Sequence, residues 1–407
     1  MRTILVMLGL LLSGWLFAVP VLGQELTPQL DGEVVPVDVS TPEFQPIEST
    51  KVVQWQHEFD TWSGSESLRL HFADIIVPDG ADVTLLIRNI TGSIIDSYDA
   101  ERLRQMSDQW SLAIPGDYAL LSLMAPASPV GLSLKVDAVA HTIWPGHDLS
   151  IIGPSNLQPI RDYAKDALVS GLSRAVAKLS FIEGTSAFVC TGFLITDELL
   201  MTNEHCVNTP ALCATTIAYF GFELRPDGFV DPGRQFRCSQ LVAVNHQLDF
   251  AVLRIAQSPG ATYGKLSLSP QVLSSNEAAF IVEHPAGRAK EIALHDCRLV
   301  QLSVPGNAPG TDLSHSCDTE GGSSGSPVFT AQGKVIALHH FGIGGAFPDR
   351  NRAVLMTRIL ADLHAKGVLL GGRGWPSIAW CHWVTVVVGG LFVGRIACGC
   401  YLSSIAV

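Results

Sequence analysis

The stretch that decides the fold is GGSSGSP at residues 321–327. Glycines on both sides of the serines let the backbone take a tight turn that larger side chains would block. In such a turn the amides of Gly322 and Ser324 can point together at one oxygen, which stabilises negative charge that develops there. We therefore predict a nucleophile at Ser324 and an oxyanion hole formed by Gly322 and Ser324. A Gly/Ser-rich surface loop is the alternative, because short motifs of this kind are common.

A serine nucleophile needs a general base, and His205 is the candidate. It follows the strand-like residues 191–196 and stands next to Cys206, with Cys190 just before that strand. A disulfide between Cys190 and Cys206 would hold the imidazole in place. A structural histidine beside a disulfide is the alternative interpretation of His205.

The acid that orients the base is predicted to be Asp249. It stands at the head of the strongly apolar residues 250–255, where a carboxylate is costly unless it accepts hydrogen bonds. An imidazole N–H would satisfy it, and a strand-end or turn aspartate is the alternative. The three candidates occur in the order His, Asp, Ser, and together they predict a triad for nucleophilic hydrolysis through an acyl-enzyme.

With these motifs, residues 174–367 resemble the trypsin-like, chymotrypsin-fold serine peptidases. The residues that carry the resemblance are Cys190, His205, Cys206, Asp249 and the stretch 322–327. The resemblance implies a mainly β fold, in which a chymotrypsin-like double β-barrel holds the triad in the cleft between its barrels. Mammalian trypsins carry, at the position of Ser323, an aspartate that pairs with a new amino terminus. The chain is therefore more similar to bacterial secreted peptidases of the glutamyl endopeptidase type.

The same resemblance assigns residues to substrate binding. In the glutamyl endopeptidases a threonine and a histidine bind the substrate carboxylate, and by spacing they match Thr319 and His339. Asp318 matches by its offset the pocket aspartate of trypsin, which favours basic side chains. The two assignments conflict, and we favour acidic over basic substrates. A core strand histidine is the alternative for His339.

Six of the nine cysteines lie within residues 190–317, as expected for disulfides formed in an oxidising compartment. The predicted bridges are Cys190–Cys206, which family position supports, Cys297–Cys317 and Cys213–Cys238. The sequence shows no cluster with metal-ligand spacing and no phosphate-binding loop, so we expect neither a metal nor a cofactor.

Composition and charge further narrow the functional class of the protein. Of the 407 residues, 47% are hydrophobic and 16% are charged, so the chain can bury real cores. The net charge of -12, without a Lys/Arg cluster, argues against a nucleic-acid partner and leaves protein or peptide as the expected substrate. Residues 1–23 are predicted to be a signal peptide, which makes the protein secreted, periplasmic or cell-surface. An uncleaved membrane anchor is the alternative.

Composition and hydrophobic patterning divide the rest of the chain into segments. Residues 24–141 begin with an extended, Pro- and acid-rich lead-in and continue with short alternating strand-like runs, which predict a small β-sandwich. Residues 142–173 are predicted to link it to the peptidase domain at 174–367, which closes with a helix over 353–366. The hydrophobic tail, 368–407, contains an apolar stretch just long enough to span a bilayer, so membrane association is an expectation here. An extension that does not enter a membrane is the alternative.

Two other functions compete with an active endopeptidase. A catalytically inactive pseudo-peptidase could bind a protein without cleaving it, although binding alone does not require all three triad groups. An adhesin could instead bind protein or carbohydrate through the β-sandwich. Labelling of the serine and binding tests on the sandwich would discriminate between these functions.

Overall fold

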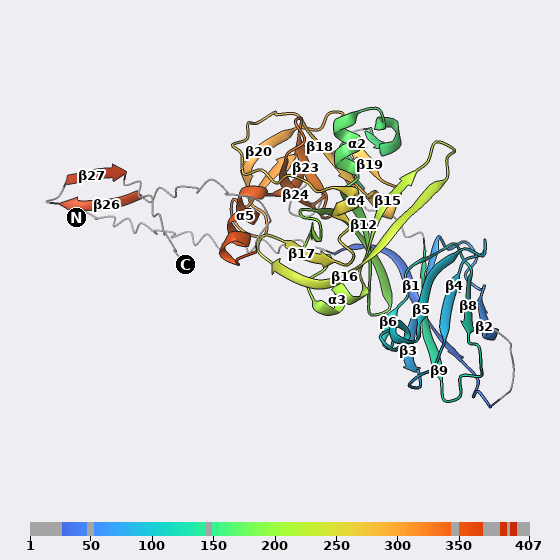
Figure 1. Cartoon of the computed structure of the whole chain (residues 1–407). Coiled ribbons are helices and arrows are strands. Elements are labelled where there is room, and N and C mark those ends of the chain that lie inside the picture. Colours follow the sequence, from blue (N-terminus) through green and yellow to red (C-terminus); the bar gives the residue numbers. More distant parts are fainter. Residues whose placement is uncertain are drawn as a thin grey trace, which may run out of the picture. The chain divides into compact units, whose positions relative to one another are not determined.

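The computed structural model shows a mainly β protein (Figure 1). The residues that it describes are 27–46, 53–143, 149–152, 154–342, 350–368, 383–388 and 391–396. Contacts divide the chain into two units, residues 1–368 and 369–407. The predicted signal peptide, 1–23, lies outside the described residues.

The N-terminal part of the first unit is a sandwich of two antiparallel sheets. One sheet contains β1 (Gln29–Ser40), β9 (Ser133–Thr142), β3 (Ser67–Ile76), β6 (Gln109–Trp110) and β7 (Ile114–Pro115). The other contains β2 (Val53–Phe59), β8 (Ala119–Met124), β4 (Thr84–Arg88) and β5 (Ile94–Asp99), which leads into the short helix α1 (Ala100–Arg104). Buried side chains of both sheets, among them Leu70, Phe72, Leu85 and Leu121, form one core. The predicted β-sandwich is confirmed.

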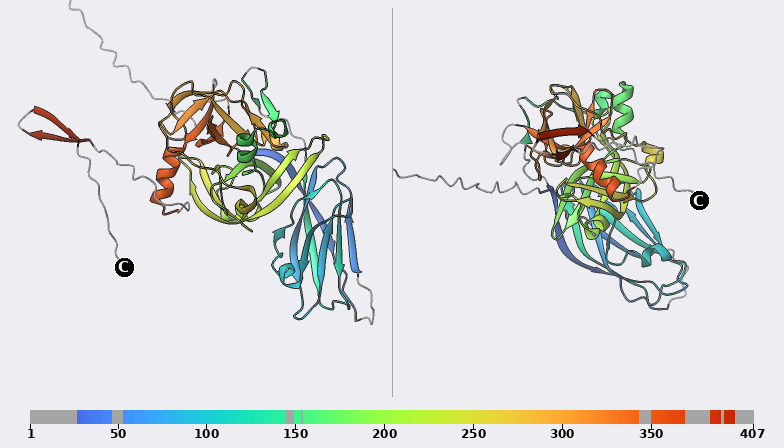
Figure 2. Two further views of the ribbon diagram at one scale, coloured as in Figure 1. Left: turned by 45° about the horizontal axis from the view of Figure 1, so that its top comes forward. Right: turned by 90° about the vertical axis from the view of Figure 1, so that its left-hand side faces the viewer.

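Strand β1 runs from the sandwich into the neighbouring barrel (Figures 1 and 2). Its first residues, Gln29 to Glu33, pair with β13 (Ser186–Leu194), and from Gly32 onward it pairs with β9. At Gly32 a side chain would overlap the carbonyl oxygen of His141, so this crossing point requires glycine. The segment expected to be only an extended lead-in therefore contains a strand that two sheets share.

A closed six-stranded barrel follows the sandwich. Its strands, in spatial order, are β12 (Val176–Glu183), β15 (Ile217–Leu224), β16 (Val230–Asn245), β17 (Phe250–Ile255), β14 (Leu199–Thr202) and β13. Because β12 also pairs with β13, the ring closes. Phe181, Phe193, Phe220 and Phe250 are fully buried in this part of the chain. The helix α3 (Pro210–Thr215) lies between β14 and β15, and the helix α4 (Gly260–Tyr263) follows β17.

An eight-stranded sheet follows. Its spatial order is β11 (Leu157–Pro159), β19 (Glu291–Ala293), β18 (Ala279–Glu283), β23 (Pro327–Thr330), β24 (Val335–Phe341), β25 (Asn351–Leu355), β21 (Asp312–His315) and β20 (Leu299–Val304). A bridge between Ala278 and Arg298 links the beginning of β18 to that of β20, so this sheet curls towards a second barrel. The closed barrel and this curled sheet form the predicted chymotrypsin-like double barrel, and the prediction of fold class is confirmed.

The predicted linker, 142–173, contains regular structure. Its elements are β10 (Leu149–Ser150), β11, the 3-10 helix η1 (Ile160–Tyr163) and α2 (Ala167–Ser173). Strand β10 pairs with β22 (Thr319–Glu320), and β11 pairs with β19. This segment therefore pairs with strands at 291–293 and 319–320 rather than running free as a linker, while the predicted domain boundaries stay predictions.

The C-terminal helix and tail differ in part from expectation. The helix α5 (Met356–Ala365) begins after residue 353, because residues 351–355 form strand β25 beside β21 and β24. In the second unit the described residues are two antiparallel strands, β26 (Trp383–Val388) and β27 (Leu391–Ile396). Among the described residues, no helix is long and apolar enough to cross a membrane. The predicted membrane association of the tail stays a prediction.

Candidate active site

The imidazole of His205 is fixed by the carboxylate of Asp249. His205 follows β14, and Asp249 occupies the turn before β17, with a φ of 40°. One Asp249 oxygen accepts from the His205 backbone N–H at 2.9 Å, and the other contacts His205 Nδ1 at 2.8 Å. Since an ionised carboxylate only accepts hydrogen bonds, Nδ1 carries the proton and Nε2 is left with its lone pair. The ring is thereby held in the tautomer that a general base needs.

The Asp249 carboxylate is charged although it is fully buried. Burial alone would raise its pKa, but the adjacent imidazoles of His205 and His340 lower the pKa well below its usual range. The side-chain amide of Asn203 donates to the Asp249 carbonyl at 2.8 Å and holds the turn that carries the acid. The acid is thus ionised throughout the neutral pH range.

The strand β13 connects the nucleophile candidate to the base candidate. The backbone N–H of Thr191 donates to the Ser324 carbonyl at 2.8 Å. The preceding residue, Cys190, forms a disulfide with Cys206, which neighbours His205. Within the described part of the chain, His205 Nε2 has no hydrogen-bond partner, so the bond from the Ser324 hydroxyl is not formed in this structure. Such bonds often tighten only when substrate is bound.

The turn before Ser324 is held in place by hydrogen bonds to its carbonyl groups. The Gly321 carbonyl accepts from the Ala286 N–H, and the Gly322 carbonyl accepts from the Thr191 hydroxyl at 2.9 Å. Gly322 has a φ of 92°, which glycine adopts without strain. Among residues 154–342, the N–H groups of Gly322 and Ser324 have no acceptor. Two unoccupied donors in one turn are what an oxyanion hole requires.

Ser323, the residue before the nucleophile candidate, interacts with a buried acid that the sequence analysis missed. The Ser323 hydroxyl accepts from the Glu320 N–H at 3.1 Å, and its side chain neighbours Glu283 at the end of β18. Burial raises the pKa of Glu283 well above its usual range, and the nearby Glu291 and Glu320 carboxylates add to the rise. The burial of Glu283 therefore favours its neutral form, and its position in an apolar strand gave no signal in the sequence.

The buried residues His340 and Asp312 complete the polar surroundings of Asp249. His340 Nδ1 contacts Asp249 at 3.1 Å, and His340 Nε2 contacts Asp312 at 2.7 Å. Neither His340 nor Asp312 was predicted. The pair His339-His340 was a visible signal, but only His339 was assigned a role from it.

The residues assigned to substrate binding have different environments. The two carboxylate oxygens of Asp318 each accept an N–H, from Ile152 and from Asn156, both at 2.8 Å. The Thr319 hydroxyl is buried and has no hydrogen-bond partner among the described residues. His339 lies in β24 with Nδ1 3.2 Å from His315 Nε2, and burial lowers the pKa of His339 well below its usual range.

The structure contains the three predicted disulfides. They are Cys190–Cys206, Cys213–Cys238 and Cys297–Cys317. Within the described residues, the group of potential metal ligands that lie close together is Cys190, His205 and Cys206. Both sulfurs of this group are consumed by the disulfide, so it does not offer a metal site.

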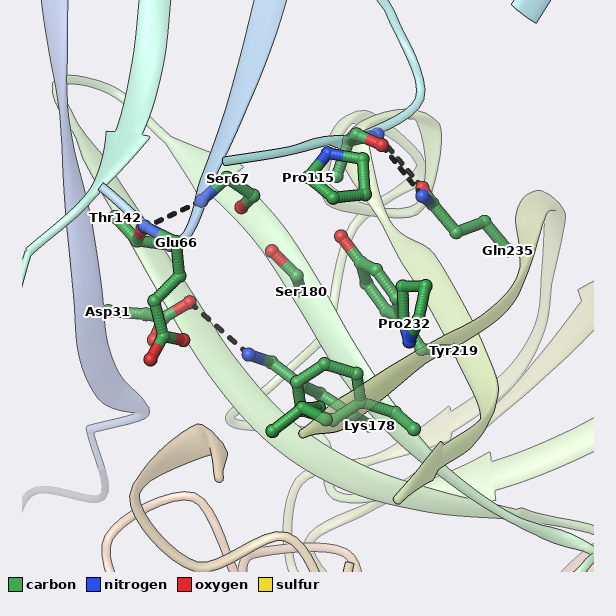
Figure 3. A pocket seen from close by; sticks show the side chains of 13 residues that line it. Asp31, Glu66, Ser67, Pro115, Thr142, Lys178, Ser180, Tyr219, Pro232 and Gln235 are labelled. Carbon is green, nitrogen blue, oxygen red and sulfur yellow. Dashed lines mark hydrogen bonds and ion pairs between the residues drawn. The ribbon is translucent and has the colours of Figure 1, made fainter. Parts of the chain in front are cut away.

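A cavity of about 280 Å³ lies between the sandwich and the closed barrel, and none of the triad candidates lines it (Figure 3). Its polar groups join the two parts. Lys178 of β12 and Asp31 of β1 form an ion pair at 3.8 Å, and Gln235 bonds both backbone groups of Ala113. The cavity therefore belongs to the junction through which β1 passes and not to the candidate active site.

Comparison with known protein families finds a match in the second part of the chain. Residues 190–338 match the trypsin-like peptidase domain, and this span includes His205, Asp249 and Ser324.

Several relatives of the peptidase domain are known. The chain is 30% identical over 237 residues to Secreted RxLR effector protein 73 of Plasmopara viticola, covering 55% of this chain and 58% of that protein. It is 22% identical over 190 residues to a glutamyl endopeptidase of Staphylococcus aureus, covering 44% of this chain and 56% of that protein. The chain thus spans less than two thirds of the length of these relatives.

Solved structures of peptidases are similar to the peptidase domain. A Glu endopeptidase aligns with a TM-score of 0.41 at 18% identity, covering 53% of this chain and 98% of that one. A protease from M. tuberculosis in its active form aligns with a TM-score of 0.40 at 18% identity, covering 51% of this chain and 87% of that one.

Proposed function

We propose that the chain is a secreted serine endopeptidase in which Ser324 is the nucleophile, His205 the general base and Asp249 the acid that orients the base. The observation that carries the proposal is the double attachment of His205 to the buried Asp249 carboxylate. A histidine that only fills space does not need its backbone and its ring bound by the same acid. The trypsin-like family of this domain supports the same reaction.

Each step of the reaction uses a group with a suitable environment. The unpartnered Nε2 of His205 removes the proton of the Ser324 hydroxyl as its oxygen attacks the substrate carbonyl. The N–H groups of Gly322 and Ser324 bind the oxyanion, and each donor is worth about 2.7–4 kcal/mol in the transition state. His205 then protonates the leaving amine, and water releases the acyl group by the same steps in reverse.

In this proposal the enzyme prefers peptide substrates that carry an acidic side chain before the cleaved bond. Asp318 does not offer an open carboxylate to a basic side chain, because its two oxygens accept the backbone N–H groups of Ile152 and Asn156. The Thr319 hydroxyl is unpartnered and can donate to a carboxylate. His339 is neutral when the site is empty, and a substrate carboxylate beside it would favour its protonated form.

Secretion agrees with the chemistry of the cysteines. Three disulfides lie within one domain, and disulfides persist in oxidising compartments outside the cytoplasm. The predicted signal peptide at 1–23 and the secreted relative from Plasmopara viticola support the same location.

Labelling with a fluorophosphonate, followed by hydrolysis of a peptide library, tests this function. We expect the folded chain to form an adduct and to cleave preferentially after Glu or Asp, while Ser324→Ala does neither. Ser326→Ala is the matched control, since Ser326 is a buried serine of the same turn whose hydroxyl has no partner among the described residues. Adduct formation by Ser324→Ala, or a folded wild-type chain that is inert to both reagents, contradicts the proposal. Cleavage after Lys or Arg contradicts only the substrate preference.

A further inference from the structure

We propose that His340 is a positioning residue: a buried cation that bridges Asp249 to a second buried carboxylate, Asp312, and limits the proton affinity of the His205–Asp249 pair. This inference deepens the proposed function and rests on it. It concerns a residue that no substrate needs to touch.

The positions of the two carboxylates around His340 determine the charge of its imidazole. The His340 side chain is 1% exposed, and the Asp249 and Asp312 side chains are 0% exposed. Each ring nitrogen faces a carboxylate oxygen, at 3.1 Å for Asp249 and 2.7 Å for Asp312. Ionised carboxylates accept and never donate, so both nitrogens must carry hydrogen, and an imidazole with two N–H groups is a cation.

Asp312 is built to retain its negative charge opposite His340. Its Oδ1 accepts from the Thr311 hydroxyl at 2.8 Å, and the backbone of Gly306 packs so closely that a side chain there would overlap the carboxylate. In the described part of the chain, His340 is the one cationic group within ion-pair distance of Asp312. Removing the cation would leave a buried carboxylate without a counter-charge, which is strongly unfavourable.

The other titratable groups around His340 do not share its charge. His315 of β21 and His339 of β24 both interact electrostatically with it, and burial lowers the pKa of His315 to about 3 and that of His339 well below its usual range. Both are neutral at pH 7. Burial also opposes the charge of His340, but Asp312 and Asp249 raise its pKa to about 9. Besides these, the other titratable groups of the network are Asp249 and its partner His205.

The consequence for the base follows from the shared oxygen. The same Oδ2 atom of Asp249 contacts His205 Nδ1 and His340 Nδ1. The His340 cation competes for the negative charge that would otherwise stabilise a protonated His205. His205 therefore stays unprotonated, and able to accept the Ser324 proton, at a lower pH than an unbridged His–Asp pair would.

The bridge predicts a shift in the pH profile of catalysis. In His340→Gln the charge beside Asp249 becomes more negative, so the acid limb of kcat/KM should move up by about one pH unit. Val354→Ala is the matched control, because Val354 is buried and pairs with Asp312 across β21 and β25 but carries no charge. It should lower the melting temperature without moving the acid limb. An acid limb that stays in place in an active His340→Gln variant overturns the inference.

A second measurement does not depend on activity or on the folding of His340→Gln. Nitrogen-15 NMR of the full chain carrying Ser324→Ala reports the protonation of each imidazole. We expect both nitrogens of His340 to remain protonated at pH 8, and the titration of His340 to fall by at least about one pH unit when Asp312→Asn is added. A neutral His340 at pH 7, or one whose titration ignores Asp312→Asn, overturns the bridge. An inert wild-type chain with a protonated His340 would instead contradict only the proposed function.

Discussion

Replacing Thr191 with valine tests how the oxyanion turn is held. The Thr191 hydroxyl is buried and serves two backbone groups: it donates to the Gly322 carbonyl at 2.9 Å and accepts from the His284 N–H at 3.0 Å. Valine keeps the shape of threonine but leaves both groups unpaired. Each buried unpaired group costs about 1–3 kcal/mol, and partial relaxation of the turn leaves an expected loss of about 2–4 kcal/mol. Thr191→Ser, which keeps the hydroxyl and loses a methyl group, should cost about 1 kcal/mol.

Urea unfolding followed by circular dichroism measures this difference, in a Ser324→Ala background that prevents self-digestion. Fluorescence is unsuitable, because all 8 tryptophans lie outside residues 174–367. In the active background, freeing the Gly322 peptide should also lower kcat/KM on the order of tenfold to a hundredfold. If Thr191→Val is as stable and as active as Thr191→Ser, the hydroxyl does not hold the turn and the reasoning is refuted.

Three further predictions follow from contacts of the same domain. Gly325→Ala should prevent folding, because Gly325 has a φ of 89° and a side chain there would overlap the Thr191 carbonyl oxygen; a soluble variant with a wild-type melting temperature contradicts this. Asp318→Asn should release residues 152–156, seen as faster amide hydrogen exchange of Ile152 and Asn156, and unchanged exchange would refute that role. The stability that these three histidines contribute should be largest near pH 6.5: the lowered pKa values of His315 (about 3) and His339 give stability that is lost as the pH falls below 6.5, while the raised pKa of His340 gives stability that is lost as the pH rises from 6.5 through 9. Calorimetry across this range, with a flat melting temperature, would contradict the third.

The sequence predicts this fold well where local chemistry is distinctive. The Gly-rich turn around Ser324 and the acid heading the apolar strand at Asp249 each have a local physical reason. The structure places His205 Nδ1 2.8 Å from a carboxylate oxygen of Asp249, while the catalytic roles of the two residues stay predictions. Each feature can be recognised because it depends on a property that few residue types have. The turn needs the backbone freedom of glycine, and the acid is a carboxylate beside an apolar segment.

The His340 bridge could not be predicted in the same way. Neighbouring residues of a strand point to opposite faces, so His339 meets His315 on one face while His340 meets Asp249 and Asp312 on the other. All residues of β24 are buried, so no alternation of polar and apolar letters reveals which face is which. The partners of the two histidines depend on strand pairings that are distant in sequence.

Strand β1 and the helix α5 show the same limit for secondary structure. The Pro- and acid-rich composition of β1 disfavours a strand, and tertiary pairing with β9 and β13 overrides that preference. At the other end, the apolar residues 353–355 fit a helix and a strand equally well. Pairing of Ala353 with Leu313 decides for the strand.

A crystal structure of the full chain with a peptide boronate tests the central claim most directly. The account predicts a covalent bond from boron to Ser324 Oγ, one boronate oxygen within hydrogen-bond distance of the Gly322 and Ser324 N–H groups, and His205 Nε2 against the adduct. A boronate bound at another residue, or at Ser324 with no oxygen facing those two amides, contradicts it.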